Sequence, residues 1–213
     1  MILINYKTYP EVTGEKSRVF TSLVASMPQS VEWVVCPQAM DLAEVAEIHP
    51  NTWAQHIDPD VQGRGTGFIT AEEAKQAGAV GTILNHSEHK LPFEVLEKTV
   101  VRAREVGLKV LIFAADVAEA QKVATLMPDW VGYEPPELIA SKDTSVAKAK
   151  PEVIASVVAA VPSIPILVGA GVKDQNDVIV SLKLGAKGVG LASGVILAAD
   201  QKAVLTDLLQ GFS

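Results

Sequence analysis

The chain has 213 residues, close to half of them apolar, and a formal net charge of -7. This length favours one domain with a sizeable core, and the negative charge argues against nucleic acid or an anionic membrane as the main partner. The single cysteine, Cys36, excludes an intrachain disulfide framework and favours an intracellular, cytoplasmic setting. The first residues are apolar over too short a stretch for a signal peptide, and no run reaches the length of a membrane span.

Eight short apolar runs are predicted as strands, and nearly every one is followed by a helical pattern. The strands are expected at 1–4, 31–35, 52–55, 79–84, 109–113, 130–134, 164–168 and 187–191. The helices are expected at about 14–27, 39–48, 71–78, 92–106, 116–126, 151–161 and 174–184, and again in most of the chain after the last strand.

This alternation predicts the fold. Strands that alternate with helices pair in parallel through right-handed crossovers, and eight such units close into a (β/α)₈ barrel, here one domain over residues 1–213. An open doubly wound sheet is the structural competitor. It usually has fewer strands and a glycine-rich loop after the first strand, whereas the first strand here is followed by Asn5-Tyr6-Lys7.

The run Trp130–Ile139 places a carboxylate at a strand end. Pro135 and Pro136 follow Glu134 directly, and their fixed backbone angles end the strand there. Glu134 is then placed to take a proton from a molecule above the sheet, although a solvated glutamate at the root of a loop is an equally good interpretation of this stretch alone.

In a (β/α)₈ barrel, the residues that follow the strands gather at one mouth. That mouth would combine a carboxylate, an imidazole, a lysine and two glycine-rich turns; the segments concerned are Asn5 to Lys7, His86 to Glu88, Glu134, Gly169 to Gly171 and Gly190 to Ser193. Turns after the last two strands of barrels often bind phosphate through backbone N–H groups. Taken singly, Lys7 is more often a surface lysine and Glu88 a first-turn helix acid. Their arrival at one rim is what indicates a site.

These segments resemble the triosephosphate isomerase family in its short archaeal-type form. The resemblance covers essentially the whole chain and rests on five motifs in order: Asn5-Tyr6-Lys7, Asn85-His86-Ser87-Glu88, Tyr133 to Ile139, Gly169-Ala170-Gly171-Val172 and Gly190-Leu191-Ala192-Ser193. It implies reversible interconversion of dihydroxyacetone phosphate and D-glyceraldehyde 3-phosphate, with no metal and no organic cofactor.

The resemblance also implies residue roles, which are those of the family. Glu134 corresponds to the base and His86 to a neutral electrophile that polarises the carbonyl. Lys7 corresponds to the cation that holds the substrate, Asn5 to a donor to the same oxygens, and Glu88 to the acid beside that lysine. The residues expected at the substrate phosphate are Asn5, Lys7, Ile139, Ala140, Gly171, Gly190, Leu191, Ala192 and Ser193.

Three departures from the family accompany the resemblance. The lid, expected at about 135–145, continues with Ala140-Ser141-Lys142 where the family usually has Gly-Thr-Gly, and Leu191 stands where a second glycine is frequent. The helices after strands two to four are short. The loop 56–68 resembles the family's interface loop, with Thr66 corresponding to a residue that reaches the neighbouring subunit, or is an ordinary mobile loop. A homo-oligomer is expected, with a tetramer as first choice and a dimer as second.

Two other functions compete with the isomerase. A different phosphate-binding barrel, such as a sugar-phosphate aldolase, would share the last two turns but have another base and no Tyr-Glu-Pro-Pro segment. A barrel that has lost catalysis would serve as a binding or scaffold protein, against which the presence of Lys7, His86 and Glu134 argues.

Overall fold

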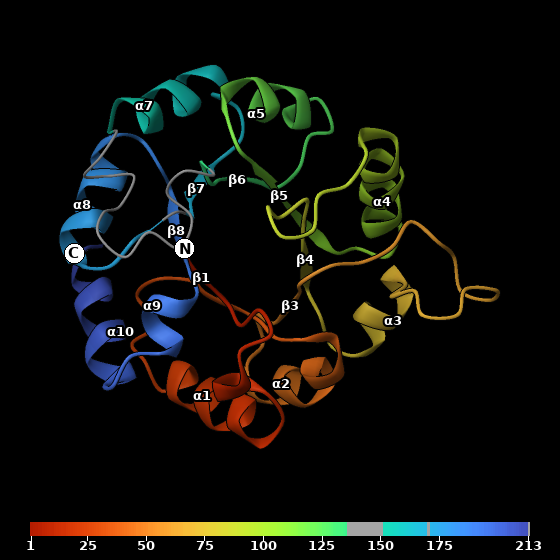
Figure 1. The fold of residues 1–213 in the computed structure, drawn as a ribbon, viewed down its shortest axis with the longest axis horizontal. Helices are drawn as coiled ribbons and strands as arrows, with labels where there is room; N and C mark the ends of the chain where they lie inside the picture. Colours follow the sequence, from red (N-terminus) through yellow and green to blue (C-terminus); the bar gives the residue numbers. More distant parts are fainter. Residues whose placement is uncertain (136–150, 170, 213) are drawn as a thin grey trace.

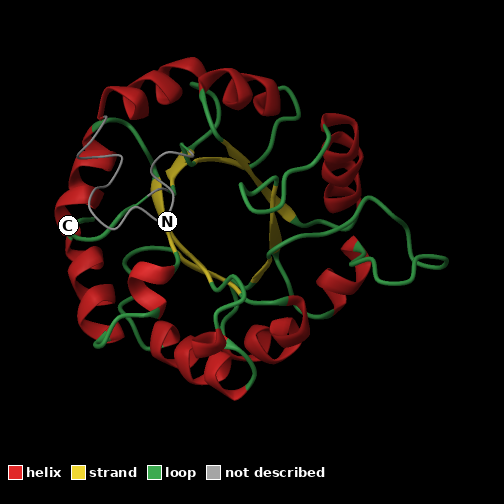
Figure 2. Ribbon diagram, viewed as in Figure 1, coloured by secondary structure: helices red, strands yellow, loops and turns green. Residues whose placement is uncertain are grey.

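The computed structural model describes residues 1–135, 151–169 and 171–212. Its strands form one parallel eight-stranded sheet in the order β2-β1-β8-β7-β6-β5-β4-β3. The two end strands meet through a parallel bridge between Val35 and Thr52, where the Val35 N–H donates to the Asn51 carbonyl at 3.2 Å. The sheet therefore closes on itself, as the ring of strands in Figure 2 shows, and the predicted (β/α)₈ barrel is confirmed.

The observed strands match the predicted ones to within a few residues. They are β1 (Ile2–Asn5), β2 (Trp33–Cys36), β3 (Trp53–Ala54), β4 (Gly81–Leu84), β5 (Lys109–Ala114), β6 (Trp130–Tyr133), β7 (Ile166–Val168) and β8 (Gly188–Leu191). The register steps regularly around the barrel, so the carboxyl ends of all strands lie at the same mouth.

The helices surround this ring (Figure 1). They are α1 (Glu15–Ala25), α2 (Leu42–Ile48), α3 (Ala71–Gln76), α4 (Phe93–Glu105), α5 (Val117–Ala124), α7 (Pro151–Ala160), α8 (Gln175–Lys183), α9 (Ser193–Ile196) and α10 (Gln201–Gln210), with 3₁₀ turns η1 (Pro10–Val12) and η2 (Ala39–Asp41). The expected shortening holds for α2 and α3 but is wrong for α4, which has 13 residues. None of the helices in the described ranges is long and apolar enough to cross a membrane.

Alternation along the strands divides the core into two layers. In β1, Ile2 and Ile4 pack outwards with the helices, whereas Leu3 joins a separate cluster built from strand residues that fills the barrel interior. Trp53 and Phe113 are the large rings of this inner cluster. Because the interior is packed, the space for a ligand lies above it, at the mouth.

Candidate active site

A cavity of about 570 Å³ lies at the carboxyl ends of the strands. It brings together the predicted site residues that the structure describes: Asn5, Lys7, His86, Glu88, Glu134, Gly171, Gly190, Leu191, Ala192 and Ser193. Each lies at the carboxyl end of a strand or within a few residues after it, so the barrel itself carries it to the mouth. Ile139, Ala140 and most of the predicted lid at about 135–145 lie outside the described residues.

Glu134 follows β6 and is buried in this cavity. Its backbone N–H donates to the Ala114 carbonyl, and the Gly169 N–H bonds to the neighbouring Tyr133 carbonyl, which fixes the strand end. The Glu134 side chain is 11% exposed, and its Oε2 has no hydrogen-bond partner among the described residues. Burial raises the pKa of the Glu134 carboxyl to about 8, although the positive charge of Lys7 opposes this. Once ionised, such a carboxylate is a strong base.

Position 169 has room for glycine alone, because its backbone packs closely against the Glu134 carboxylate. A β-carbon at Gly169 would lie 2.6 Å from both Cγ and Oε1 of Glu134. Any larger residue would therefore displace the carboxylate from the cavity floor.

The His86 ring faces Glu134, with Nε2 3.3 Å from Oε2. The Glu88 backbone N–H donates to His86 Nδ1 at 3.1 Å, so the neutral ring carries its proton on Nε2, the atom that faces Glu134. Burial and, secondly, the charge of Lys7 lower the pKa of His86 to about 4. The ring edge also packs against Phe113, with centroids 5.0 Å apart. His86 is thus a neutral hydrogen-bond donor at physiological pH.

Lys7 supplies a positive charge to the same cavity. Its backbone has φ of 48°, a left-handed conformation held because its N–H donates to Asn5 Oδ1 at 2.9 Å. The Lys7 carbonyl accepts from Gln55 Nε2 at 3.0 Å. The Lys7 Nζ pairs with Glu88 Oε1 at 2.8 Å, while the Glu88 side chain remains 57% exposed. Hydrogen bonds with Asn5 and Gln55 therefore fix the Lys7 backbone, and the ion pair with Glu88 fixes its ammonium group at the mouth.

The two glycine-rich turns approach each other closely on the far side of the cavity. A β-carbon at Gly190 would lie 3.3 Å from the Gly169 α-carbon, and Gly171 has φ of 68°. α9 begins directly at the cavity, with Ser193 as its first residue. The first N–H groups of a helix have no partner within the helix, which suits an anion there.

Sequence reasoning assigned no role to several residues that build this site. Gln55, Phe113 and Glu119 carry no motif, and their contacts depend on how three elements pack in space. Asn85 lay inside a motif and could have been found, because asparagine is enriched among the uncommon non-glycine residues with positive φ, observed here as 57°.

A closed parallel barrel whose mouth holds a carboxylate, a neutral imidazole and a lysine defines the class of barrel isomerases that move a proton next to a carbonyl. Comparison with known proteins agrees. The triosephosphate isomerase family model matches residues 1–210. The chain is 41% identical to triosephosphate isomerase from Methanothermus fervidus, over 98% of this chain and 97% of that protein. The protein of the same name from Methanosarcina mazei is 39% identical over 98% and 97%, and that from Thermoplasma volcanium is 34% identical over 98% and 99%.

The chain therefore belongs to the triosephosphate isomerase family and is an aldose–ketose isomerase.

Proposed function

We propose that the cavity at the strand ends interconverts dihydroxyacetone phosphate and D-glyceraldehyde 3-phosphate, with Glu134 as the base. The observation that carries this proposal is the pairing of the buried Glu134 carboxyl with the Nε2 side of a neutral His86, 3.3 Å apart at the mouth of the barrel. One group removes a proton from carbon while the other polarises the adjacent carbonyl oxygen.

The reaction is a balanced proton transfer. Ionised Glu134 takes a proton from the carbon next to the carbonyl, and the C–H electron pair forms the double bond of an enediolate. His86 Nε2–H donates to the oxygen on which the negative charge develops. The hydroxyl proton on the first carbon then passes, by way of His86 Nε2, to the former carbonyl oxygen. Glu134 returns its own proton to the neighbouring carbon, so the carbonyl and hydroxyl groups exchange carbons without net oxidation or reduction.

Lys7 and Asn5 are proposed to steady the developing charge. Lys7 is a cation that lines the cavity, and its ion pair with Glu88 holds the ammonium group at the mouth. The Asn5 Oδ1 accepts from the Lys7 N–H, which fixes the amide group, and its NH₂ group is proposed to donate to the substrate oxygens.

The substrate phosphate is proposed to lie against Gly171, Gly190, Leu191, Ala192 and Ser193. The support is that these residues line the cavity and combine a glycine turn with a helix start. Ile139 and Ala140 of the lid are proposed to complete this site on closure, by resemblance to the family.

The substitution Glu134→Gln tests the role of the base. The amide keeps the shape but has no basic lone pair, so kcat should fall by at least about a thousandfold while KM changes little. A coupled assay with D-glyceraldehyde 3-phosphate measures this. Glu47→Gln, on the exposed side of α2, is the matched control and should keep its activity. Near-normal turnover of Glu134→Gln would remove Glu134 from the mechanism.

We also propose a homo-oligomer, with a tetramer before a dimer, in which the loop around Thr66 contacts a neighbouring subunit. The loop projects from the barrel (Figure 1, orange), and its neck is tied by paired bonds of 2.7 Å between Asp58 and Ile69. Val61 and Phe68 in this loop expose 61% and 48% of their surface. Light scattering that found an active monomer at micromolar concentration would refute this proposal.

A cytoplasmic location and a single domain are proposed for the same chain. The buried free thiol of Cys36 suits a reducing compartment. A single cooperative heat-capacity transition would support one domain, and separate transitions would contradict it. Activity in the cytosolic fraction of the source cells would support the cytoplasmic location, and activity elsewhere would contradict it.

A further inference from the structure

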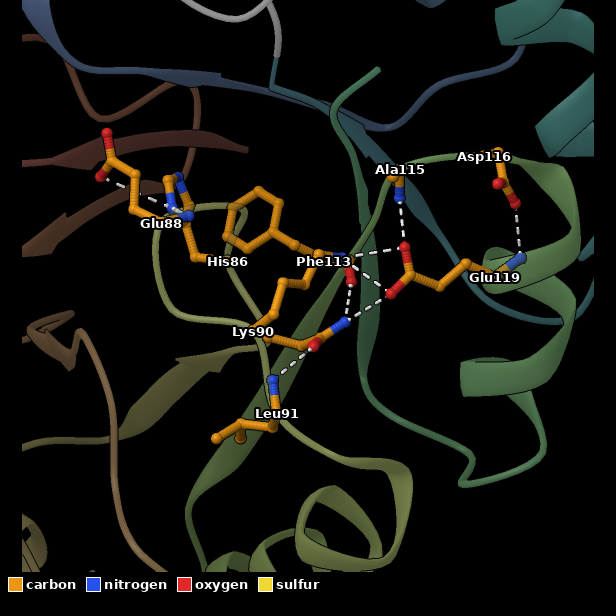
Figure 3. A network of polar contacts seen from close by, with 9 residues as sticks. His86, Glu88, Lys90, Leu91, Phe113, Ala115, Asp116 and Glu119 are labelled. Carbon is orange, nitrogen blue, oxygen red and sulfur yellow. Dashed lines mark hydrogen bonds and ion pairs between the residues drawn. The ribbon is translucent and has the colours of Figure 1, made fainter. Parts of the chain in front are cut away.

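A polar cluster lies beside the cavity, between the β4–α4 loop and the start of α5. It consists of Asn85 and Lys90, which are in the loop that carries His86, and Glu119 from the first turn of α5. Figure 3 shows the Glu119 carboxylate at the centre of this cluster, with the loop and Ala115 around it. None of the three lines the 570 Å³ cavity, so their role is not direct contact with substrate.

Asn85 ties both ends of the loop to the barrel. Its Oδ1 accepts from the Leu91 N–H at 3.0 Å, which joins the first residue of the loop to a residue near its end. Its Nδ2 donates to the Phe113 carbonyl at 2.9 Å and to Glu119 Oε1 at 2.9 Å. Asn85 is buried, with φ of 57°. Every polar atom of this side chain is thus used to shape the turn in which His86 is the next residue.

Glu119 accepts hydrogen bonds from three residues in two segments. Its Oε2 accepts from the Ala115 N–H at 2.7 Å, and its Oε1 accepts from Asn85. Lys90 Nζ donates to both carboxylate oxygens, at 2.7 and 2.9 Å. Burial alone would raise the pKa of Glu119, but the bonds from Lys90, Ala115 and Asn85 bring it below its ordinary value. The carboxylate is therefore ionised and fixed, with the loop attached at both ends.

We propose that Glu119 and Asn85 are positioning residues for the isomerisation, which hold the β4–α4 loop against α5 and so fix the His86 ring towards Glu134. This inference rests on the role of His86 proposed above. Apart from the Nε2 contact with Glu134, the hydrogen bonds of His86 within the described residues go to Glu88 and His89, which belong to the same loop. The placement of the ring then depends on the placement of the loop, and the Asn85–Glu119 pair sets that.

The expected kinetic signature is a loss of kcat with little change in KM. His86 acts on charge that develops in the transition state, and the phosphate turns on the opposite side of the cavity bind substrate independently of this loop. Glu119→Ala and Asn85→Gly should each lower kcat by about tenfold or more and change KM by less than about threefold, since misplacement by 1 Å costs up to about a hundredfold. Glycine at 85 keeps the positive φ, so this variant removes only the side-chain bonds.

Two further variants make the test specific. Asp129→Ala removes a carboxylate that accepts from the Val110 N–H at 2.8 Å, at the opposite end of β5. It should lower Tm to a similar extent while kcat stays within about twofold on the same rate scale. Glu119→Gln keeps the shape and should retain an intermediate kcat, which preserves the test if Glu119→Ala does not fold.

Nitrogen NMR of labelled histidine gives the structural readout. In the native protein and in Asp129→Ala, the His86 ring should be neutral with its proton on Nε2, as its Nδ1 contact requires. In Glu119→Ala and Asn85→Gly, a mixture of the two neutral tautomers should appear, because the loosened loop no longer holds the Glu88 N–H on Nδ1.

The outcomes separate this inference from the proposed function. If His86→Asn is nearly inactive but Glu119→Ala and Asn85→Gly keep their kcat and a single His86 tautomer, the positioning role is wrong and the role of His86 stands. If His86→Asn itself is fully active, the proposed function of His86 fails first. If loss of kcat merely follows loss of Tm, with Asp129→Ala equally affected, the pair is structural only and the inference is overturned.

Discussion

Two glutamates on adjacent β/α units have opposite surroundings. Glu134 ends β6 in a cavity where its Oε2 has no hydrogen-bond partner among the described residues, and burial raises its pKa to about 8. Glu119 follows the neighbouring strand β5, receives bonds from Lys90, Ala115 and Asn85, and has a lowered pKa. Among the described residues, no hydrogen bond is formed at Glu134 Oε2, which His86 Nε2 faces at 3.3 Å, whereas the Glu119 carboxylate accepts four hydrogen bonds.

The difference shows how one barrel assigns separate tasks to chemically identical groups. A carboxylate without donors is a strong base, because little stabilises its charge, and that suits proton removal from carbon. A carboxylate with several donors is a weak base and a firm structural link. Burial of Glu134 lowers the stability of the fold and raises the basicity of its carboxylate. The bonds of Glu119 with Asn85 and Lys90 fix the loop that carries His86.

Crowding Glu134 is the change expected to break the comparison most strongly. In Gly169→Ala, the new methyl group would lie 2.6 Å from Glu134 Cγ and Oε1, so the carboxylate must move. We expect kcat to fall by about a hundredfold, because a displaced base no longer reaches the substrate carbon. Steady-state kinetics measures this, with circular dichroism to establish folding. A fully active Gly169→Ala would mean that the observed Glu134 position is not the productive one.

The pH dependence of the free energy of unfolding gives a smaller effect that distinguishes the two glutamates. The folded pKa of Glu134 is raised, so between about pH 4.5 and pH 8 the folded state holds a proton that the unfolded chain has lost, and wild-type stability falls as the pH rises. At pH 8, Glu134→Gln should therefore be more stable than wild type by about 2 kcal/mol, and by less at pH 5.

Glu119→Gln should have the opposite sign. Its folded pKa is lowered, so its contribution is present above the ordinary carboxyl pKa and is lost as the pH falls through the folded value. At pH 8, Glu119→Gln should be less stable than wild type by about 1 kcal/mol, since charged hydrogen bonds are lost at a partly exposed site. Urea unfolding at pH 5 and pH 8 measures both variants. Equal signs for the two would refute the contrast.

The sequence predicted the parts of the site that depend on strand ends alone. Alternating apolar runs and helical patterns fix the barrel, and the barrel then carries Lys7, His86 and Glu134 to one mouth whatever the details of packing.

The remaining features depend on contacts between elements, which no local pattern encodes. Glu119 looks like an ordinary first-turn helix acid, and only the packing of α5 beside the β4–α4 loop brings it to Asn85. The expectation of a short helix after strand four was wrong, although the bounds expected from the apolar spacing, about 92–106, match α4, whose buried face continues through Ala103. Gln55 was not predicted because its contacts are with distant parts of the chain. Its Nε2 donates to the backbone carbonyls of Lys7 and Cys36, near the ends of β1 and β2.

The most direct test is the titration of the two carboxyl groups by carbon NMR of protein labelled at the glutamate side-chain carboxyl. Spectra of Glu134→Gln and Glu119→Gln assign the two signals by their absence. The account predicts that Glu134 titrates well above the ordinary value of 4.5, near pH 8, and that Glu119 titrates below 4.5. A Glu134 midpoint at or below 4.5 would contradict the claim that a buried carboxylate with a raised pKa is the base of this barrel.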